Sequence, residues 1–127
     1  MATNIVTKKA KEKIAKARVG LIERLPIVQG FAFGNGGVDS SGAVLEVDVN
    51  ATTLNNEIYR RPYESYEFIS PTTCRYTISL GEDELTGQSI SEIGLYDSDG
   101  DLINVKHFLT KGKDADLMIT FYIDDEF

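Results

Sequence analysis

The stretch "SEIGLYDSDGDLINVKHF", Ser91–Phe108, predicts two β-strands joined by a tight turn. Two apolar segments, "ISEIGLYD" and "LINVKHFL", flank the short connector "SDG". An Asp-Gly pair between apolar segments is a strong local signal for a hairpin, because both residues tolerate the positive φ angles of tight turns. We therefore expect an antiparallel hairpin whose turn contains Asp99 and Gly100.

The same turn carries three aspartates at alternate positions, which raises the alternative of a calcium loop. Asp97, Asp99 and Asp101 would supply the first ligands, but an EF-hand loop also needs glycine at position six and a bidentate Glu at position twelve. Counting from Asp97, those positions are Leu102 and Phe108. We expect a turn without metal and no cofactor, and the three aspartates remain weak candidates for an incidental calcium contact.

Further segments with a period of two predict more strands. "TCRYTISLG" and "DLMITFYID" alternate cleanly and are expected to be central and half-buried strands. "PIVQGFAFG" is a further strand, followed by the turn-rich loop "NGGVDSSGA". The residues expected to face the core from the first two strands are Cys74, Tyr76, Ile78 and Leu80, and Leu117, Ile119, Phe121 and Ile123.

The amino-terminal segment has a helical period instead. An apolar stripe over residues 4–24 predicts an amphipathic helix, with Thr3 or Asn4 as its cap and Pro26 limiting its continuation. The stripe consists of Val6, Ala10, Ile14, Ala17 and Leu21. Residues 1–25 contain seven basic and two acidic side chains, whereas the whole chain of 127 residues has a net charge of −7. The helix is either a basic interaction arm or a solvated face beside the acids of the body.

The predicted fold class is mainly β, an antiparallel sheet or sandwich with one amino-terminal α-helix, and α+β is the alternative label. A chain of this length forms a single domain. We expect residues 1–25 to form the basic helix and residues 26–127 to form the β domain.

The polar segment "TTLNNEIYRRPYESYEF" suggests a short helical turn from Thr52 or Thr53 through Glu57, followed by edge-strand positions beside Pro62. Its arginines and tyrosines resemble a nucleic-acid surface in composition. Phosphate binding needs a positive potential at the contact, and residues 26–127 carry six basic and eighteen acidic side chains. We therefore expect the arginines to pair with nearby acids, with no nucleic-acid partner.

Several other functions are disfavoured by the residues present. "FGNGG" lacks both the dinucleotide fingerprint and the lysine of a phosphate loop, and no apolar run is long enough to span a bilayer. Cys74 has the pattern of an inert core thiol, and His107 that of a residue on a sheet face. We expect neither an enzyme nor a membrane partner.

The order of the motifs resembles the phage tail-collar fibre family. A basic helix is followed by "FAFGNGGVDSSG", then "TTLNNEIYRRP", then "SEIGLYDSDGDL", from about residue 5 to the end of the chain. Two of these strings match the family's motifs residue by residue. The matched positions are Leu54, Asn56, Glu57 and Arg60 in one string, and Ser91, Glu92, Ile93, Gly94, Leu95, Tyr96 and Gly100 in the other.

We interpret these matched residues as structural positions. Glu57 and Arg60 are three residues apart and could pair along a helical turn. Glu92 is an acid within an apolar strand, so it needs a hydrogen-bond donor if it is buried.

The resemblance implies a structural protein of a phage or prophage tail, made in the cytoplasm of a bacterial host and located in the virion tail. It implies attachment of a tail fibre to the baseplate, with other tail or baseplate proteins as partners. The chain carries no repeat shaft or distal tip, which favours a short collar or connector piece, or a prophage remnant. The alternative is a small β-sandwich module that recognises a carbohydrate or a cell surface.

Assembly is expected to involve the basic helix. Its apolar stripe is bounded by lysines, so its flanks suit an acidic neighbour, which a second copy of the chain can supply. Fibre-type proteins are usually trimers, so the resemblance favours three copies in a homo-oligomer.

Overall fold

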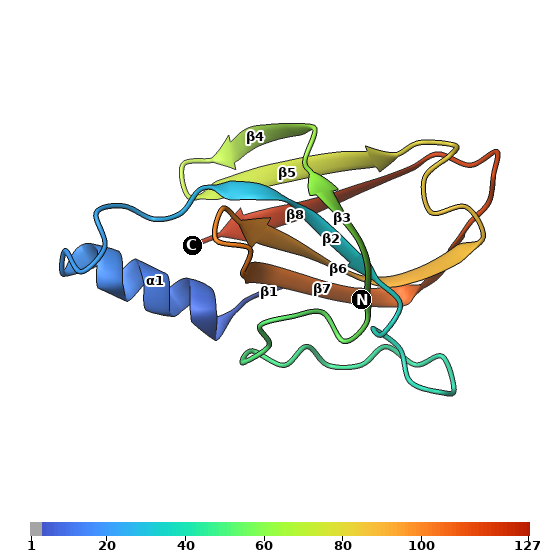
Figure 1. Cartoon of the computed structure of the whole chain (residues 1–127), viewed down its shortest axis with the longest axis horizontal. Helices are drawn as coiled ribbons and strands as arrows, with labels where there is room; N and C mark the ends of the chain where they lie inside the picture. Colours follow the sequence, from blue (N-terminus) through green and yellow to red (C-terminus); the bar gives the residue numbers. More distant parts are fainter. Residues whose placement is uncertain (1–3) are drawn as a thin grey trace.

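The computed structural model describes residues 4–127 and confirms a mainly β fold with one helix among these residues (Figure 1). The strands form two antiparallel sheets, a five-stranded sheet in the order β1-β7-β6-β2-β3 and a three-stranded sheet in the order β4-β5-β8. The elements of the first sheet and the helix are β1 (Asn4–Val6), α1 (Lys8–Arg18), β2 (Val28–Gly34), β3 (Glu57–Pro62), β6 (Gln88–Asp97) and β7 (Leu102–Lys113). Those of the second sheet are β4 (Ser65–Ser70), β5 (Thr73–Leu80) and β8 (Ile119–Glu126).

The hairpin predicted from residues 91–108 is confirmed as β6 and β7. Its turn is closed by two backbone bonds, from the N–H of Asp97 to the carbonyl oxygen of Asp101 (3.0 Å) and from the N–H of Gly100 to that of Asp97 (2.9 Å). Gly100 has φ 89°, a conformation that favours glycine because it has no Cβ. Gly100 therefore supplies the left-handed conformation at which the chain reverses, whereas Asp99 does not adopt a positive φ.

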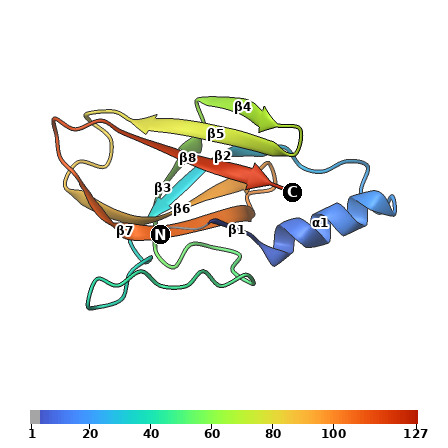
Figure 2. The ribbon, with the colours of Figure 1, turned by 180° about the vertical axis from the view of Figure 1, so that it is seen from behind.

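The main core lies between the two sheets. The five-stranded sheet contributes Phe31 and Phe33 of β2 with Ile93 and Leu95 of β6, and all four are almost inaccessible to solvent. The three-stranded sheet supplies the opposing side chains, which are Ile78, Leu80, Phe121 and Ile123. Figure 2 shows the two sheets facing each other from the opposite side of the molecule.

A second, smaller core covers the other face of the five-stranded sheet. Val47 and Leu54, from the long connection between β2 and β3, pack there against side chains of the sheet. The sheet contributes Ala32, Tyr96, Leu102 and Val105. Because both faces of β6 are covered, every residue from 91 to 97 is buried, and the strand does not alternate between core and solvent.

The prediction of two central strands in the carboxy-terminal half is correct for one of them. β5 lies between β4 and β8 and places Ile78 and Leu80 in the core, as expected. β8 is instead an edge strand, and Leu117 precedes it and is 40% exposed. The alternating pattern identified the faces of both strands, but it contains no information about which strand lies at the edge.

The predicted helix over residues 4–24 is too long at both ends. Asn4–Val6 form β1, which pairs antiparallel with β7, so Val6 belongs to a strand. Thr7 caps the helix, because its Oγ1 accepts the N–H of Ala10 at 3.2 Å. Asn4 is not the cap, since its side chain donates to Asn104 Oδ1 and to the Asp124 carbonyl oxygen. The alternative cap, Thr3, lies outside the described residues.

The apolar stripe predicted for the helix is only partly covered, since Val6, Ile14 and Ala17 are half-buried. Ala10 is its one buried member among the described residues of α1, and Leu21 lies beyond the helix and is 74% exposed. The helix ends at Arg18 in a Schellman motif, in which the N–H of Gly20 bonds to the Ala17 carbonyl oxygen and the N–H of Leu21 to that of Lys16. The helical spacing of the apolar residues thus correctly predicted a helix but overestimated its length.

The helical turn predicted from Thr52 or Thr53 through Glu57 is also wrong. Residues 51–56 are loop and turn, and Glu57 begins the edge strand β3. The predicted pairing of Glu57 with Arg60 is nevertheless present, with Arg60 Nη2 at 2.9 Å from Glu57 Oε1. The segment does not form a helical turn, and the backbone N–H groups of Asn55 and Asn56 donate instead to the carboxylate of Glu92 on β6.

Candidate functional site

The carboxylate of Glu92 holds together the matched sequence segments. Glu92 lies on β6 and its side chain is inaccessible to solvent. Its Oε2 accepts the backbone N–H groups of Gly36 and Asn56, each at 2.8 Å, and its Oε1 accepts that of Asn55 at 2.9 Å. We call Glu92 and these three N–H groups the Glu92 clamp. The clamp supplies the donors that a buried acid requires.

The glycine loop must approach β6 closely for the clamp to form. The N–H of Gly37 donates to Ser91 Oγ at 2.9 Å, and a Cβ on Gly37 would collide with the carbonyl oxygen of Ser91. Asn55 Nδ2 also donates to the carbonyl oxygen of Gly36 at 2.8 Å. Glycine at position 37 is therefore required by this contact.

His107 faces Glu92 from the neighbouring strand β7. Its Nε2 is 3.6 Å from Glu92 Oε1, and its Nδ1 lies 2.9 Å from the carbonyl oxygen of Leu45 in the loop that covers the sheet. Burial alone would raise the pKa of Glu92, but the contact with His107 and the backbone N–H groups outweigh it and lower the pKa. The contact with Glu92 raises the pKa of His107 against the effect of burial. The pair therefore favours the doubly charged state.

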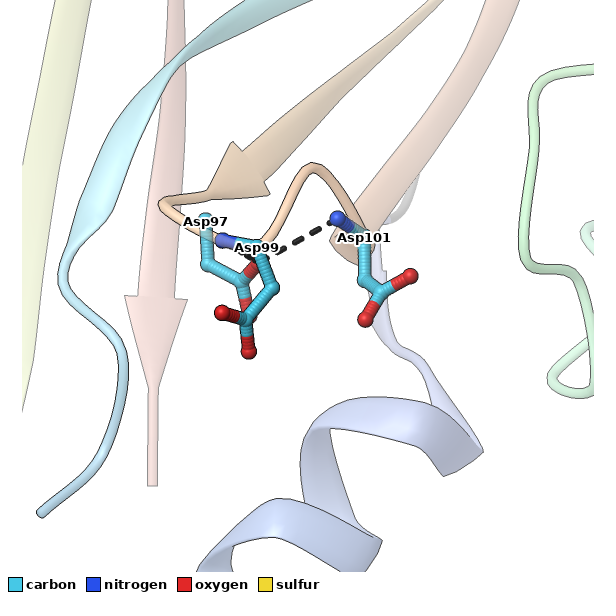
Figure 3. Close-up of side chains that lie close together, drawn as sticks. All are labelled: Asp97, Asp99 and Asp101. Carbon is cyan, nitrogen blue, oxygen red and sulfur yellow. Dashed lines mark hydrogen bonds between the residues drawn. The ribbon is translucent and has the colours of Figure 1, made fainter.

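The acidic turn between β6 and β7 binds a cation from the chain itself. Lys13 Nζ lies 2.6 Å from Asp97 Oδ2, 3.1 Å from Asp99 Oδ2 and 2.8 Å from Asp101 Oδ2. Figure 3 shows the three carboxylates gathered at the turn, above the helix. Asp97 Oδ1 also accepts the backbone N–H groups of Asp99 and Asp101, which shapes the turn.

These three aspartates are the weak metal candidates of the sequence, and their ligand atoms do lie within 4.8 Å of one another. The ammonium group of Lys13 contacts all three of these carboxylates. Burial lowers the pKa of Lys13, but hydrogen bonds to Asp101, Asp97 and Asp99 outweigh it and raise the pKa. The arrangement attaches the basic helix to the body through Lys13.

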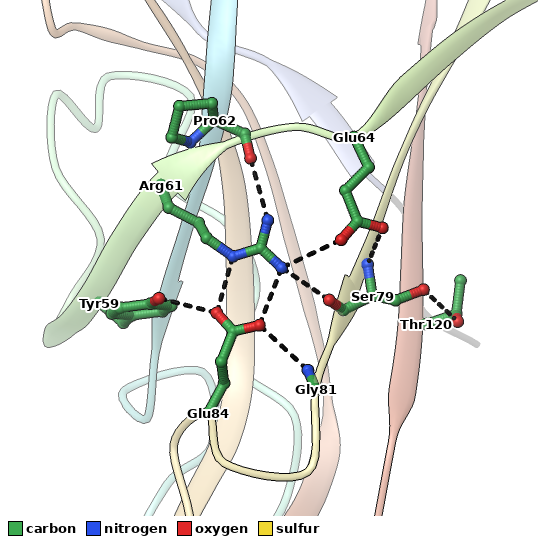
Figure 4. A network of polar contacts seen from close by, with 8 residues as sticks. All are labelled: Tyr59, Arg61, Pro62, Glu64, Ser79, Gly81, Glu84 and Thr120. Carbon is green, nitrogen blue, oxygen red and sulfur yellow. Dashed lines mark hydrogen bonds and ion pairs between the residues drawn. The ribbon is translucent and has the colours of Figure 1, made fainter.

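A third polar cluster connects the two sheets through Arg61 (Figure 4). Arg61 on β3 donates to Glu84 from Nε (2.7 Å) and Nη2 (2.9 Å), and to the carbonyl oxygen of Ser79 on β5 (2.6 Å). Glu84 also accepts from Tyr59 Oη and from the N–H of Gly81. The bonds from Arg61 are the main cause that lowers the pKa of Glu84 to about 2. Arginine pairing with nearby acids is confirmed, but no local pattern indicated that Glu84 would be the partner of Arg61.

The remaining matched residues also have structural positions. Arg60 lies over the ring of Tyr96, with its Cζ 4.3 Å from the ring centroid, and donates to the carbonyl oxygen of Gly100 at 2.9 Å. Leu54 is buried in the second core, while a side chain on Gly94 would crowd Leu102. The structure thus brings the two matched strings together across β2, β3, β6 and β7.

Two residues with reactive side chains are used structurally. Cys74 is buried with no disulfide partner, and both ring nitrogens of His107 face Glu92 and Leu45. The buried acid–histidine pair lacks a nucleophile in contact with it among the hydrogen bonds of residues 4–127. Its chemistry is that of a hydrogen-bonded support for the loop.

Comparison with known proteins identifies the family. A family model described as "Phage tail-collar fibre protein, N-terminal" matches residues 1–118. Neither the comparison with curated proteins nor the comparison with solved structures finds a match. Within residues 4–127, the helix is too short and too polar to cross a membrane. The chain therefore belongs to the phage tail-collar fibre family and is a structural component of a phage tail, in a family not known for enzymatic activity.

Proposed function

We propose that this chain attaches a tail fibre to the baseplate, or acts as a short collar or connector piece in the virion tail, after its synthesis in the bacterial host cytoplasm. The supporting observation is the convergence of the matched segments on the Glu92 clamp. Both oxygens of Glu92 already accept backbone N–H groups, so the role of the motif is to hold the loops of the domain in place. This is the role expected of an attachment module.

The clamp gives a long connection a fixed shape. The segment between β2 and β3 contains no helix or strand, and such long connections are usually mobile or functional. Here both ends of the segment bind Glu92, and its middle is held by burial of Val47 and by the carbonyl oxygen of Leu45, which accepts a hydrogen bond from His107 Nδ1. A connector that transmits force between two assemblies benefits from a surface that does not deform.

We further propose two parts with different roles. The rigid body comprises residues 26–127 together with β1, which pairs with β7, and α1 with the segment up to residue 25 forms the element that packs across subunits or onto a tail or baseplate protein. Exposed apolar side chains support the second role, since Val19 and Leu21 are each 74% exposed. We propose a homo-oligomer, with three copies favoured.

The test is the location of the chain in tail particles. The phage or prophage tail genes would be expressed with an epitope tag on this chain, and the particles purified and labelled with gold-conjugated antibody. We expect label at the baseplate end of each tail, and no label on particles carrying the same tag on an unrelated cytoplasmic protein.

Particles that lack the chain, while it is abundant in the soluble lysate, would contradict the proposal. Saturable binding of the purified chain on a glycan array would instead favour the alternative of a carbohydrate-recognition module.

A further inference from the structure

The first of two complementary surfaces is the basic arm, which we define as residues 8–27, comprising α1 and the linker to β2. Lys13 is the one cation of this arm with a carboxylate oxygen within 4.0 Å among residues 4–127. The cations of the arm without such a partner are Lys8, Lys9, Lys11, Lys16, Arg18 and Arg24, and its acids are Glu12 and Glu23. The arm therefore presents an excess of positive charge to solvent.

The carboxyl end of α1 adds apolar surface to this charge. In a Schellman motif the residue after the glycine, here Leu21, usually packs against an apolar side chain one turn earlier. The corresponding position in this helix is Lys16, and Leu21 is left 74% exposed beside Val19. Ile27, at the end of the linker, is 67% exposed. Most of the surface of these three side chains is therefore exposed to solvent in the isolated chain.

The second surface is the acidic end, which we define as residues 82–83 and 114–118. Its two segments belong to the loop between β5 and β6 and to the turn between β7 and β8. Its four carboxylates are exposed and have no cationic partner within 4.0 Å among residues 4–127. They are those of Glu82, Asp83, Asp114 and Asp116.

A buried lysine joins the two segments into one surface. The side chain of Lys113 is almost inaccessible, and its Nζ donates to the carbonyl oxygens of Glu82 (3.3 Å) and Asp114 (3.2 Å). The acidic end also carries exposed apolar side chains, because Met118 is 61% and Leu117 40% exposed. The nearby Lys111 is exposed, with its Nζ 5.9 Å from the ring centroid of Phe108.

The two surfaces lie at opposite ends of the long axis of the molecule. Figure 1 places α1 at one end and the β5–β6 and β7–β8 connections at the other, and Figure 2 agrees from behind. One chain therefore cannot bring its own basic arm onto its own acidic end without unfolding.

We propose that copies of this chain associate head to tail, with the basic arm of one copy bound to the acidic end of the next. The proposal rests on the homo-oligomer proposed above and specifies its interface. Each end combines unpaired charge of one sign with exposed apolar side chains, and the two signs are opposite. Contact would pair lysines and arginines with carboxylates while burying Val19 and Leu21 against Leu117 and Met118.

A head-to-tail contact has a consequence for symmetry. The two patches differ, so the interface is heterologous, and it forms a closed ring when the rotation between copies divides a full turn, or an open chain when it does not. Three copies in a ring satisfy the stoichiometry proposed above. The attraction is largely electrostatic at an exposed interface, so it weakens as salt shortens the Debye length.

The experiment measures self-association of the full chain by analytical ultracentrifugation over a range of concentrations. One variant reverses charge on the arm (Lys16→Glu with Arg18→Glu), a second reverses it on the acidic end (Asp114→Lys with Asp116→Lys), and a third combines all four changes. The control, Glu46→Lys with Glu67→Lys, makes the same charge change as the second variant at exposed acids that have no cationic nitrogen within 4.0 Å among residues 4–127.

At low ionic strength, each reversal is expected to weaken association by about tenfold or more, whereas the combined variant returns close to the native affinity. The control should associate like the native chain, and about 1 M salt should dissociate the native oligomer. Circular dichroism melts of each variant separate loss of association from loss of folding.

Two results overturn the inference. A native chain that stays a single monomeric species at high concentration and low salt excludes head-to-tail association, while leaving attachment to tail particles intact. The second result is an oligomer whose self-association is unchanged in the arm variant, the acidic-end variant and the control. That result would place the interface elsewhere. Absence of the chain from tail particles, by contrast, would contradict the proposed function but would leave the ultracentrifugation test of self-association unaffected.

Discussion

Replacement of Glu92 by Gln tests whether the clamp holds the loops that carry the matched sequence segments. The substitution preserves size and shape but leaves one acceptor oxygen in place of two. Whichever way the amide is oriented, its NH₂ group faces at least one backbone N–H. In the less costly orientation, the N–H of Asn55 loses its acceptor, while Gly36 and Asn56 keep the remaining oxygen.

The size of the effect follows from these contacts. A hydrogen bond to a charged group contributes about 1.5–3 kcal/mol, and leaving a buried donor unpaired costs a similar amount. The two bonds that remain become neutral and weaker, and the ion pair with His107 is lost. Removing a buried charge offsets part of this loss. We expect Glu92→Gln to reduce the free energy of unfolding by about 2–4 kcal/mol.

The assay is urea denaturation at near-neutral pH, followed by circular dichroism at a fixed protein concentration, because oligomers gain stability with concentration. Glu57→Gln is the matched control. Its ion pair with Arg60 is partly exposed, with 31% of the Glu57 side chain accessible, so the expected loss is below about 1 kcal/mol. Hydrogen exchange adds a local measurement, in which protection of the Asn55 amide should fall more than that of the β5 core.

The reasoning would be refuted if Glu92→Gln unfolded at the same urea concentration as Glu57→Gln. Unchanged exchange at the Asn55 amide would lead to the same conclusion. Either outcome would mean that the loop is held by its apolar contacts and that the buried carboxylate is incidental.

Three further predictions concern charge and close packing. In the folded state the pKa of Glu92 is lowered from 4.5 and that of His107 is raised from 6.5. The stability contributed by Glu92 is therefore lost as pH falls below 4.5, and the stability contributed by His107 is lost as pH rises above 6.5. Between pH 6.5 and the raised pKa of His107, the native chain should lose stability more steeply than His107→Gln in the same urea denaturation assay. Thermal melts of the native chain in EDTA and in millimolar calcium should coincide, and a large upward shift in calcium would contradict the metal-free turn. Lys13→Ala removes the cation from the three aspartates of the turn, so it should lower the melting temperature in EDTA, and calcium should restore part of the loss. Gly37→Ala should destabilise the chain by about 2 kcal/mol or more, because its Cβ would collide with backbone, and an unchanged urea midpoint would show that the glycine loop can move away from β6.

Local patterns predicted the elements whose stability is decided locally. The Asp-Gly pair specified the turn of the β6–β7 hairpin, and strict alternation identified the core face of β5. The need of Glu92 for a donor also followed from its place in an apolar strand. These predictions succeeded because each depends on a few neighbouring residues and on the period of the backbone.

The errors occurred where distant residues decide the outcome. Asn4–Val6 continue the helical pattern but pair with β7, a strand far along the chain that no local period can indicate. Residues 52–56 leave the predicted helical turn since two of their N–H groups bind Glu92. No spacing in the sequence shows that residues 36, 55, 56 and 92 share one carboxylate.

The sequence by itself determined the mainly β class, the position of the hairpin and the family resemblance, because turn residues and an alternation of apolar and polar residues each depend only on neighbouring positions. The tertiary structure alone decided which donors satisfy Glu92, that Lys13 binds the acidic turn, and that the basic arm and the acidic end lie at opposite ends of the molecule. These features depend on contacts between residues far apart in the chain. Such contacts are set by how the two sheets pack and by which charges that packing brings within a few ångströms of each other, and neither can be read from one segment.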